Sequence, residues 1–166
     1  MTSPSLPNAP NDEITACAWI ASIPDFDTSM VGTTLPPDAD PDGTPAPWLQ
    51  TGYVTVAVAG GSPDPLLPVR RPVLDVQCWA TVPGSNRPPW MDAFALAEAI
   101  QKACWDRHTQ NRTVTPVVNG IDYPVVSVQG ARLLTTWRRL YSDEADYACL
   151  SADLWLSWIA PGEQIA

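Results

Sequence analysis

A strict alternation of apolar and mostly polar residues runs from Tyr147 to Ile159, near the C-terminal end of the chain. The apolar positions of this segment are Ala148, Leu150, Ala152, Leu154, Leu156 and Trp158. A period of two predicts a long β-strand with one face against a core, so the strand belongs to a sheet with one covered face. No cluster of acids, bases or nucleophiles in the sequence is as clear, and the pattern therefore favours a packed, self-associating structural protein over an enzyme.

Three further segments have the pattern of strands. Residues 53–59 and 72–82 both alternate, and the Gly and Pro cluster from Gly60 to Pro65 predicts that they form a hairpin with a proline-rich tip. The third region, 125–141, changes the parity of its apolar positions at Gly130, as a β-bulge requires.

Two segments have helical periodicity. A short helix, capped by Asn11 or Asp12, is expected to end at Ser22 or Ile23. Its apolar stripe is Ile14, Cys17, Ala18 and Ala21. A longer helix follows Pro88 and Pro89, and its apolar stripe is Ala93, Leu96, Ala97, Ile100, Ala103 and Cys104.

The remaining segments are expected to be arms and loops. Residues 1–10 contain three prolines and predict a flexible N-terminal arm. Residues 25–47 contain five Asp and neither Lys nor Arg, which predicts a long, acidic, proline-rich loop. Residues 109–123 are expected to form a loop that turns at Asn119-Gly120. The order of elements predicts a single α+β domain over 11–166, a mostly antiparallel twisted sheet of about four main strands with helices packed on one face.

Charge and composition narrow the possible partners. The chain has 166 residues and a formal net charge of -9, which argues against a grip on a nucleic-acid backbone, because such binding needs clustered Lys and Arg. No segment approaches the roughly 18 apolar residues of a membrane span, so no membrane partner is expected. The four cysteines stand singly and are expected to be small buried hydrophobes in a reducing compartment; they are Cys17, Cys78, Cys104 and Cys149.

The sequence evidence for a metal site is weak, and no bound cofactor or metal is expected. Residues 38–43 copy the D-x-D-x-D-G start of a calcium loop, but the twelfth position is Leu49 in place of a bidentate Glu, so an acidic turn is the favoured interpretation. Cys78, Cys104 and His108 could share a metal, although their scattered spacing is poor evidence for one. Gly60-Gly61 lacks the Lys of a phosphate-binding loop and is interpreted as a turn.

Four landmarks in this order carry a family resemblance: YVTVAVAGGS, RPVLDVQCWA, DAFALAEAIQKACW and GARLLTTWRRLYSDEADYACLSADLWLSW. The pattern resembles the tail terminator (tail completion) proteins of long-tailed bacteriophages, especially those that infect actinobacteria. The likeness covers roughly residues 11–160 and lies in the arrangement of elements, without an invariant signature. The acidic segment 25–47 is longer than in the simplest members of that family.

The resemblance implies a structural virion protein without enzymatic activity. Such proteins form a hexameric ring, which caps the tail tube, ends its polymerisation and joins the tail to the head and neck. The implied partners are copies of the same chain, the major tail tube protein and a neck or head-completion protein, while genomic DNA passes through without specific binding. The implied location is the head-proximal end of the virion tail, after assembly in the host cytoplasm.

Ring closure needs two different complementary patches on each subunit, and Trp and Arg are enriched at interface hot spots. The candidate interface residues are Trp79, Trp90, Arg138, Arg139 and Trp155. Each could instead pack within its own subunit. Two other functions stay open at this point: another head-to-tail connector or stopper protein, and a small cytosolic metal- or ligand-binding α+β domain.

Overall fold

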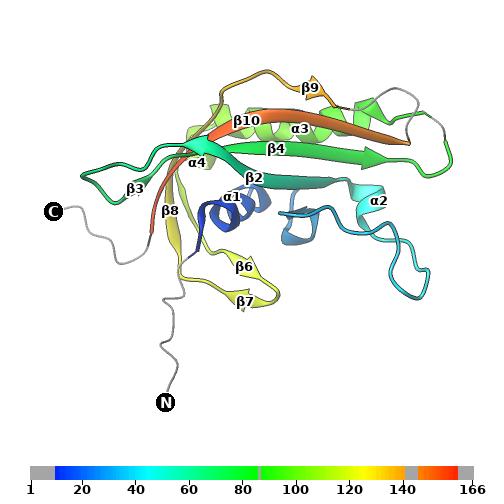
Figure 1. The fold of residues 1–166 in the computed structure, drawn as a ribbon, viewed down its shortest axis with the longest axis horizontal. Helices are drawn as coiled ribbons and strands as arrows, with labels where there is room; N and C mark the ends of the chain where they lie inside the picture. Colours follow the sequence, from blue (N-terminus) through cyan, green and yellow to red (C-terminus); the bar gives the residue numbers. More distant parts are fainter. Residues whose placement is uncertain (1–9, 86, 141–145, 161–166) are drawn as a thin grey trace, which may run out of the picture.

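The computed structural model describes residues 10–85, 87–140 and 146–160 (Figure 1). The expected arm at 1–10 lies outside these ranges, except for Pro10. The helices are α1 (Asp12–Ala21), η1 (Thr28–Met30), α2 (Trp48–Thr51), α3 (Trp90–Trp105) and α4 (Arg107–Gln110). The strands are β1 (Val31–Gly32), β2 (Tyr53–Gly61), β3 (Val69–Arg70), β4 (Pro72–Thr81), β5 (Arg112–Val114), β6 (Val117–Val118), β7 (Ile121–Asp122), β8 (Val126–Leu133), β9 (Arg138–Arg139) and β10 (Tyr147–Ile159).

The fold is α+β, as expected, but its curled main sheet is larger than about four strands and is mixed. It has eight strands in the order β1-β2-β4-β10-β8-β5, with β3 and β9 also paired to β10. The long strands β2, β4 and β10 match the predicted segments, whereas the predicted region 125–141 contains two strands, β8 in its first half and the short β9 near its end. The others are two or three residues long, too short to display an alternation, and β1 pairs in parallel with β2.

β10 is a central strand, and it buries more of its polar face than the alternation alone indicates. It pairs with β4 along one edge and with β8 and β9 along the other. All six apolar positions of the alternation are fully buried, but Cys149 and Ser151 on the opposite face are fully buried as well. Neighbouring strands on both sides therefore shield positions that an edge strand would expose to water.

The long helix agrees with its predicted pattern. α3 buries Ala93, Ala97, Ile100, Ala103 and Cys104 against the sheet, and Leu96 packs at the margin of the same core. The core face of β4 presents Leu74, Val76, Cys78 and Ala80, as the alternation predicted. Small Ala side chains bring the helix close to the strands, where α3 lies across β4, β10 and β8.

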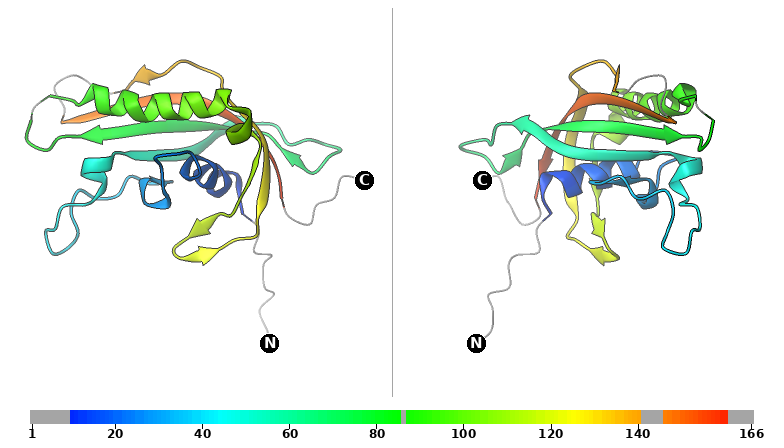
Figure 2. Two further views of the ribbon diagram at one scale, coloured as in Figure 1. Left: turned by 180° about the vertical axis from the view of Figure 1, so that it is seen from behind. Right: turned by 45° about the vertical axis from the view of Figure 1, so that its right-hand side comes forward.

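The stripe predicted for α1 is only partly confirmed: Cys17, Ala18 and Ala21 pack at the margin of the core, but they are not its centre. Asn11 caps the helix as expected, accepting a hydrogen bond from the backbone N–H of Ile14 at 2.8 Å. The fully buried apolar residues, however, are Ala16, Trp19 and Ile20. The indole Nε1 of Trp19 donates to the backbone oxygen of Thr109 at 2.8 Å, which fixes the rotation of the helix. Both α1 and α3 contribute to one core cluster, so they cover the same face of the sheet (Figure 2).

The expected bulge at Gly130 is confirmed. Ser157 of β10 pairs with Gly130 and Trp158 pairs with Val128, so Gln129 has no partner on β10. The extra residue keeps Val126 and Val128, and then Ala131, on the core side of the sheet.

Residues 109–123 are more regular than the loop predicted for them. They contain β5, which forms one edge of the sheet, and the β6–β7 hairpin, which pairs only with itself. The hairpin turns at Asn119 and Gly120, as expected, with φ of 51° and 77° at these two residues. Within the acidic segment 25–47, Met30 and Val31 are buried beside β2, whereas residues 37–45 are exposed.

Candidate interaction surface

The face of the sheet opposite α1 and α3, hereafter the open face, has a row of partly exposed polar and aromatic side chains. Its members on the two longest strands include Asp75, Gln77, Trp79, Asp153 and Trp155. The register places Ser151 beside Gln77 and Asp153 beside Asp75, which confirms that these positions share one face.

The centre of the open face is a hydrogen-bonded polar strip. The hydroxyl of Ser151 donates to Oδ1 of Asp75 at 2.6 Å, and Nε2 of Gln77 donates to Oδ2 of the same carboxylate at 3.0 Å. Both carboxylate oxygens of Asp75 therefore have donors within the subunit. The hydroxyl of Ser151 and the amide of Gln77 are therefore engaged by one carboxylate, which is the bonding of a structural network.

Two indoles flank the polar strip, and each is held in place. Nε1 of Trp79 donates to the hydroxyl of Thr55 at 3.1 Å. The guanidinium carbon of Arg132 lies 4.7 Å from the ring centroid of Trp155. The two Trp are six positions apart in the register, roughly 20 Å along the sheet. The open face thus presents two fixed aromatic surfaces with a polar strip between them.

The structure divides the five predicted interface residues into two groups. Trp79, Trp155 and Arg138 belong to the open face, since Arg138 pairs with Ser151. Arg139 pairs with Leu150 and faces the helix side, where its guanidinium carbon lies 4.4 Å from the ring centroid of Trp90. This second pair connects β9 to the start of α3 within one subunit.

The sequence reasoning missed a second exposed patch, at the C-terminal end of α3. Trp105 is 71% exposed and Leu134 is 47% exposed, and both line a cavity of about 360 Å³ together with Arg132 and Trp137. The available signal was that Trp105 follows the stripe residue Cys104 and so falls off the buried face of the helix.

A cavity of about 660 Å³ lies between α1 and the β5–β6 segment. Its walls include Cys17, Ala18 and Ala21, three members of the stripe that was expected to face the core. Arg112 also lines it, with Nη1 donating to the backbone oxygen of Ser22 at 2.8 Å. Burial raises the pKa of the Cys17 thiol to about 12, so this group is a protonated thiol near neutral pH and a poor nucleophile.

The candidate metal ligands are not brought together. Within residues 10–85, 87–140 and 146–160 there is no group of three or more His, Cys, Asp or Glu side chains that could hold a metal ion. The four cysteines are free thiols, and burial raises the pKa of Cys78 well above its ordinary value and that of Cys104 to about 12. A metal site would need thiolates, which this environment disfavours.

Residues 38–43, which resemble the start of a calcium-binding loop, form an acidic turn, as the sequence indicated. Oδ1 of Asp40 accepts hydrogen bonds from the backbone N–H groups of Asp42 at 3.1 Å and Thr44 at 2.9 Å. A β-bridge between Ala39 and Pro45 closes the turn. The carboxylate of Asp40 thus satisfies the backbone of its own loop.

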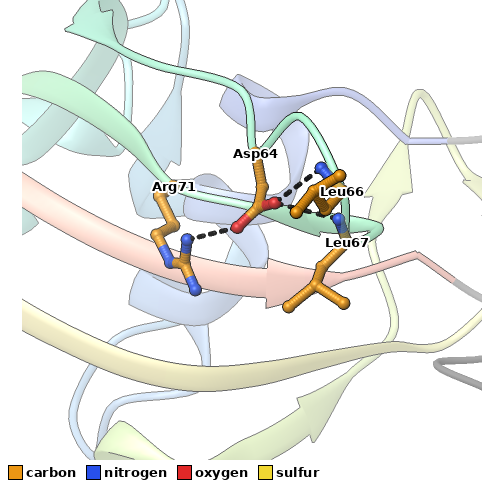
Figure 3. A network of polar contacts seen from close by, with 4 residues as sticks. All are labelled: Asp64, Leu66, Leu67 and Arg71. Carbon is orange, nitrogen blue, oxygen red and sulfur yellow. Dashed lines mark hydrogen bonds and ion pairs between the residues drawn. The ribbon is translucent and has the colours of Figure 1, made fainter.

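The tip between β2 and β3 is held by Asp64 (Figure 3). Oδ1 of Asp64 accepts from the backbone N–H groups of Leu66 and Leu67, both at 2.9 Å, and Oδ2 forms an ion pair with Arg71 at 2.8 Å. These bonds lower the pKa of Asp64, the backbone bonds most strongly. Arg70 stacks over Trp158 with its guanidinium carbon 4.9 Å from the ring centroid, so both arginines of this pair have partners within the subunit.

The helices in the described ranges are too short or too polar to cross a bilayer. The sequence matches neither a protein-family model nor a curated protein. Among solved structures, the chain is similar to a chain from the virion of a native gene transfer agent (GTA) particle, with 16% sequence identity and a TM-score of 0.45. The alignment covers 94% of this chain and 98% of that chain.

Proposed function

We propose that the chain is a structural virion protein that forms a ring at the head-proximal end of a phage tail. In this role it caps the tail tube, ends its polymerisation and joins the tail to the neck. The observation that carries the proposal is the open face, where Trp79 and Trp155 are fixed on the side of the sheet away from α1 and α3. The order of strands and helices in the sequence, which resembles that of tail terminator proteins, is its second support.

Fixed aromatic side chains are effective anchors for a partner. An indole that is already held by Thr55 or Arg132 loses little conformational freedom on binding, so more of the free energy of burying its surface is retained. Trp is also among the residues most enriched at interface hot spots. The open face therefore has the properties of a binding surface for another protein of the virion, the tail tube protein or the neck protein.

The charge of the chain agrees with a passage for DNA. A hexamer would have a formal charge of 6 × -9 = -54. An acidic ring repels phosphates, so the genome would pass through its centre without specific binding. No bond chemistry is required in this role, and among the described residues Cys78, Cys104 and His108 form no common metal site.

A tube-capping assay tests the proposal. Purified protein is added to tail tube protein from the phage that encodes the chain, and tube lengths are measured in negative stain. We expect short tubes of uniform length with a cap at one end. Trp79→Ala and Trp155→Ala should lose this activity, whereas Met91→Ala, an exposed apolar position on α3, should retain it.

Two outcomes would count against the proposal. Folded wild-type protein that leaves tube length unchanged would rule out a terminator. A ring that binds neck protein but leaves tube length unchanged would instead identify a connector or stopper, the second candidate from the sequence.

A further inference from the structure

A groove follows one side of α3, between this helix and the segments 23–26 and 49–52. It consists of two adjoining cavities, with volumes of about 340 Å³ and 410 Å³. Asp25, Ala95 and Ala99 line both cavities, so the two form one groove, hereafter the α3 groove. Because α3 itself is one of its walls, the groove lies on the helix side of the sheet and is separate from the open face.

The α3 side of the groove is built from small side chains. Ala95, Ala99 and Ala103 recur every four residues and therefore lie on one side of the helix. Side chains as small as these let a second helix pack closely. The lining of the groove extends from Asp92 to Asp106, about 21 Å at the rise of an α-helix, which is room for about four turns of a partner helix.

The charged side chains around the groove are mostly acidic. Four carboxylates line it with a single ammonium group; they are Asp25, Asp92, Glu98 and Asp106, with Lys102. Among the described residues, the carboxylates of Asp25, Asp92 and Glu98 have no hydrogen bond or ion pair within the chain. Asp25 belongs to one wall and Glu98 to the other, so negative charge lies on both sides of the apolar centre. This arrangement favours a partner with basic side chains on both flanks.

The helices of a second copy do not have this charge. α1 begins with Asp12 and Glu13 and contains no basic residue. α3 contains Asp92 and Glu98 and only one base, Lys102. The other helices of the described ranges have four residues or fewer. A helix that complements the α3 groove therefore comes from another protein.

We propose that the α3 groove binds a basic, amphipathic α-helix of a partner protein. The apolar stripe of the partner helix packs on Ala95 and Ala99, and its Lys or Arg side chains lie beside Asp25 and Glu98. A helix in a groove is a common mode of peptide recognition. This contact goes beyond the proposed ring, because it uses a surface that neither the tube nor the neck needs to occupy at the open face.

Binding of a synthetic helix tests the proposal. The probe has about four turns, with Leu and Ala on one face and Lys on both flanks of that face. Isothermal titration at about 0.15 M salt should find saturable binding of one peptide per chain. A peptide with Glu in place of every Lys should not bind, because its charge matches that of the groove.

Charge variants separate the groove from a general attraction to an acidic chain. Glu98→Lys should weaken binding of the Lys probe by about tenfold or more, because a like charge then faces the probe. Asp25→Asn should weaken it by a smaller factor, and Asn tolerates the positive φ of 73° at this position. Asp42→Lys, in the exposed acidic turn, changes the net charge as much as Glu98→Lys and should leave the affinity unchanged.

A bulky side chain tests the shape of the groove. Ala95 is exposed, so Ala95→Trp should fold normally, but its indole fills the groove and should abolish binding. Met91→Trp is the matched control, because Met91 is 81% exposed and does not line the groove. Urea unfolding confirms that both variants are folded.

Three results would overturn the proposal: wild-type protein that does not bind the Lys probe, equal weakening by Asp42→Lys and Glu98→Lys, or full binding by Ala95→Trp. Loss of self-association in folded Ala95→Trp would identify a second copy as the occupant and would also overturn it. Tube capping by the wild-type protein is measured without the probe, so failure of the proposed function and failure of the groove are distinguishable.

Discussion

The indole Nε1 of Trp158 donates a 2.9 Å hydrogen bond to Oδ1 of Asp12. This bond connects the end of the last strand to the first residue of α1, so the two ends of the fold support each other. Trp158 is fully buried, and its N–H would be costly to leave without an acceptor.

We predict that Asp12→Ala lowers the free energy of unfolding by about 1–3 kcal/mol, because it removes the acceptor of a buried donor. Asp12→Asn keeps an acceptor and should cost less, losing mainly the favourable charge at the helix N-terminus, about 0.3–1 kcal/mol. Urea unfolding of the three proteins measures this order. An equal loss of unfolding free energy in both variants would mean that the charge of Asp12, and not its hydrogen bond to Trp158, stabilises the fold.

Two neighbouring glycines give opposite expectations. Gly61 has φ of 105°, and a Cβ there would lie 2.6 Å from the backbone oxygen of Arg71. A Cβ at Gly60 would meet nothing within 4 Å. Gly61→Ala should therefore destabilise the fold by about 1–3 kcal/mol, and Gly60→Ala should stay within about 0.5 kcal/mol of the wild type.

Chemical denaturation measures both glycine variants under one set of conditions. If Gly61→Ala proved as stable as Gly60→Ala, that result would contradict the close contact between Gly61 and the backbone of Arg71.

The phenol of Tyr147 is expected to ionise late. It donates a hydrogen bond to Oδ2 of Asp38, and this bond, followed by burial and nearby charge, raises its pKa to about 12 from an ordinary value of 10.0. A raised pKa in the folded state means that the stability contributed by this group is complete below pH 10.0 and is lost as the pH rises toward 12.

Spectrophotometric titration of the tyrosines checks this. The latest-ionising component should disappear in Tyr147→Phe and should shift toward 10.0 in Asp38→Asn, which removes the acceptor charge. A titration curve that is the same in Asp38→Asn and the wild type would contradict the assigned contact.

The thiols are expected to react slowly in the folded protein. Cys78, Cys104 and Cys149 are buried, and burial raises the pKa of each. Cys17 is partly exposed and should be modified first by a thiol reagent. Counting labelled thiols by mass before and after unfolding tests this, and fast labelling of Cys149 in the native state would place the centre of β10 at the surface.

Long elements could be predicted from the sequence because each repeats its pattern several times. The alternation of β10, the stripe of α3 and the parity change at Gly130 all have this redundancy, and all three agree with the structure. The short strands β1, β3, β5 and β9 have two or three residues and no period to detect. Tertiary pairing alone makes them strands.

The candidate surfaces were only partly predictable for a related reason. Strand parity was enough to place Trp79 and Trp155 on the open face. The pairing of Arg139 with Trp90 and the orientation of Trp19 depend on how α1 and α3 dock, which the local pattern does not encode. The exposed patch at the C-terminal end of α3 was missed because it forms where the end of a helix meets a distant segment, at Trp105 and Leu134.

The mass of the wild-type protein in solution tests the central claim most directly, namely that copies of this chain close into a ring. Native mass spectrometry over a range of protein concentrations should find a closed species, with six copies of 18.0 kDa giving 6 × 18.0 = 108 kDa. A chain that stays at 18.0 kDa at every concentration, and also in the presence of tail tubes, would contradict the account.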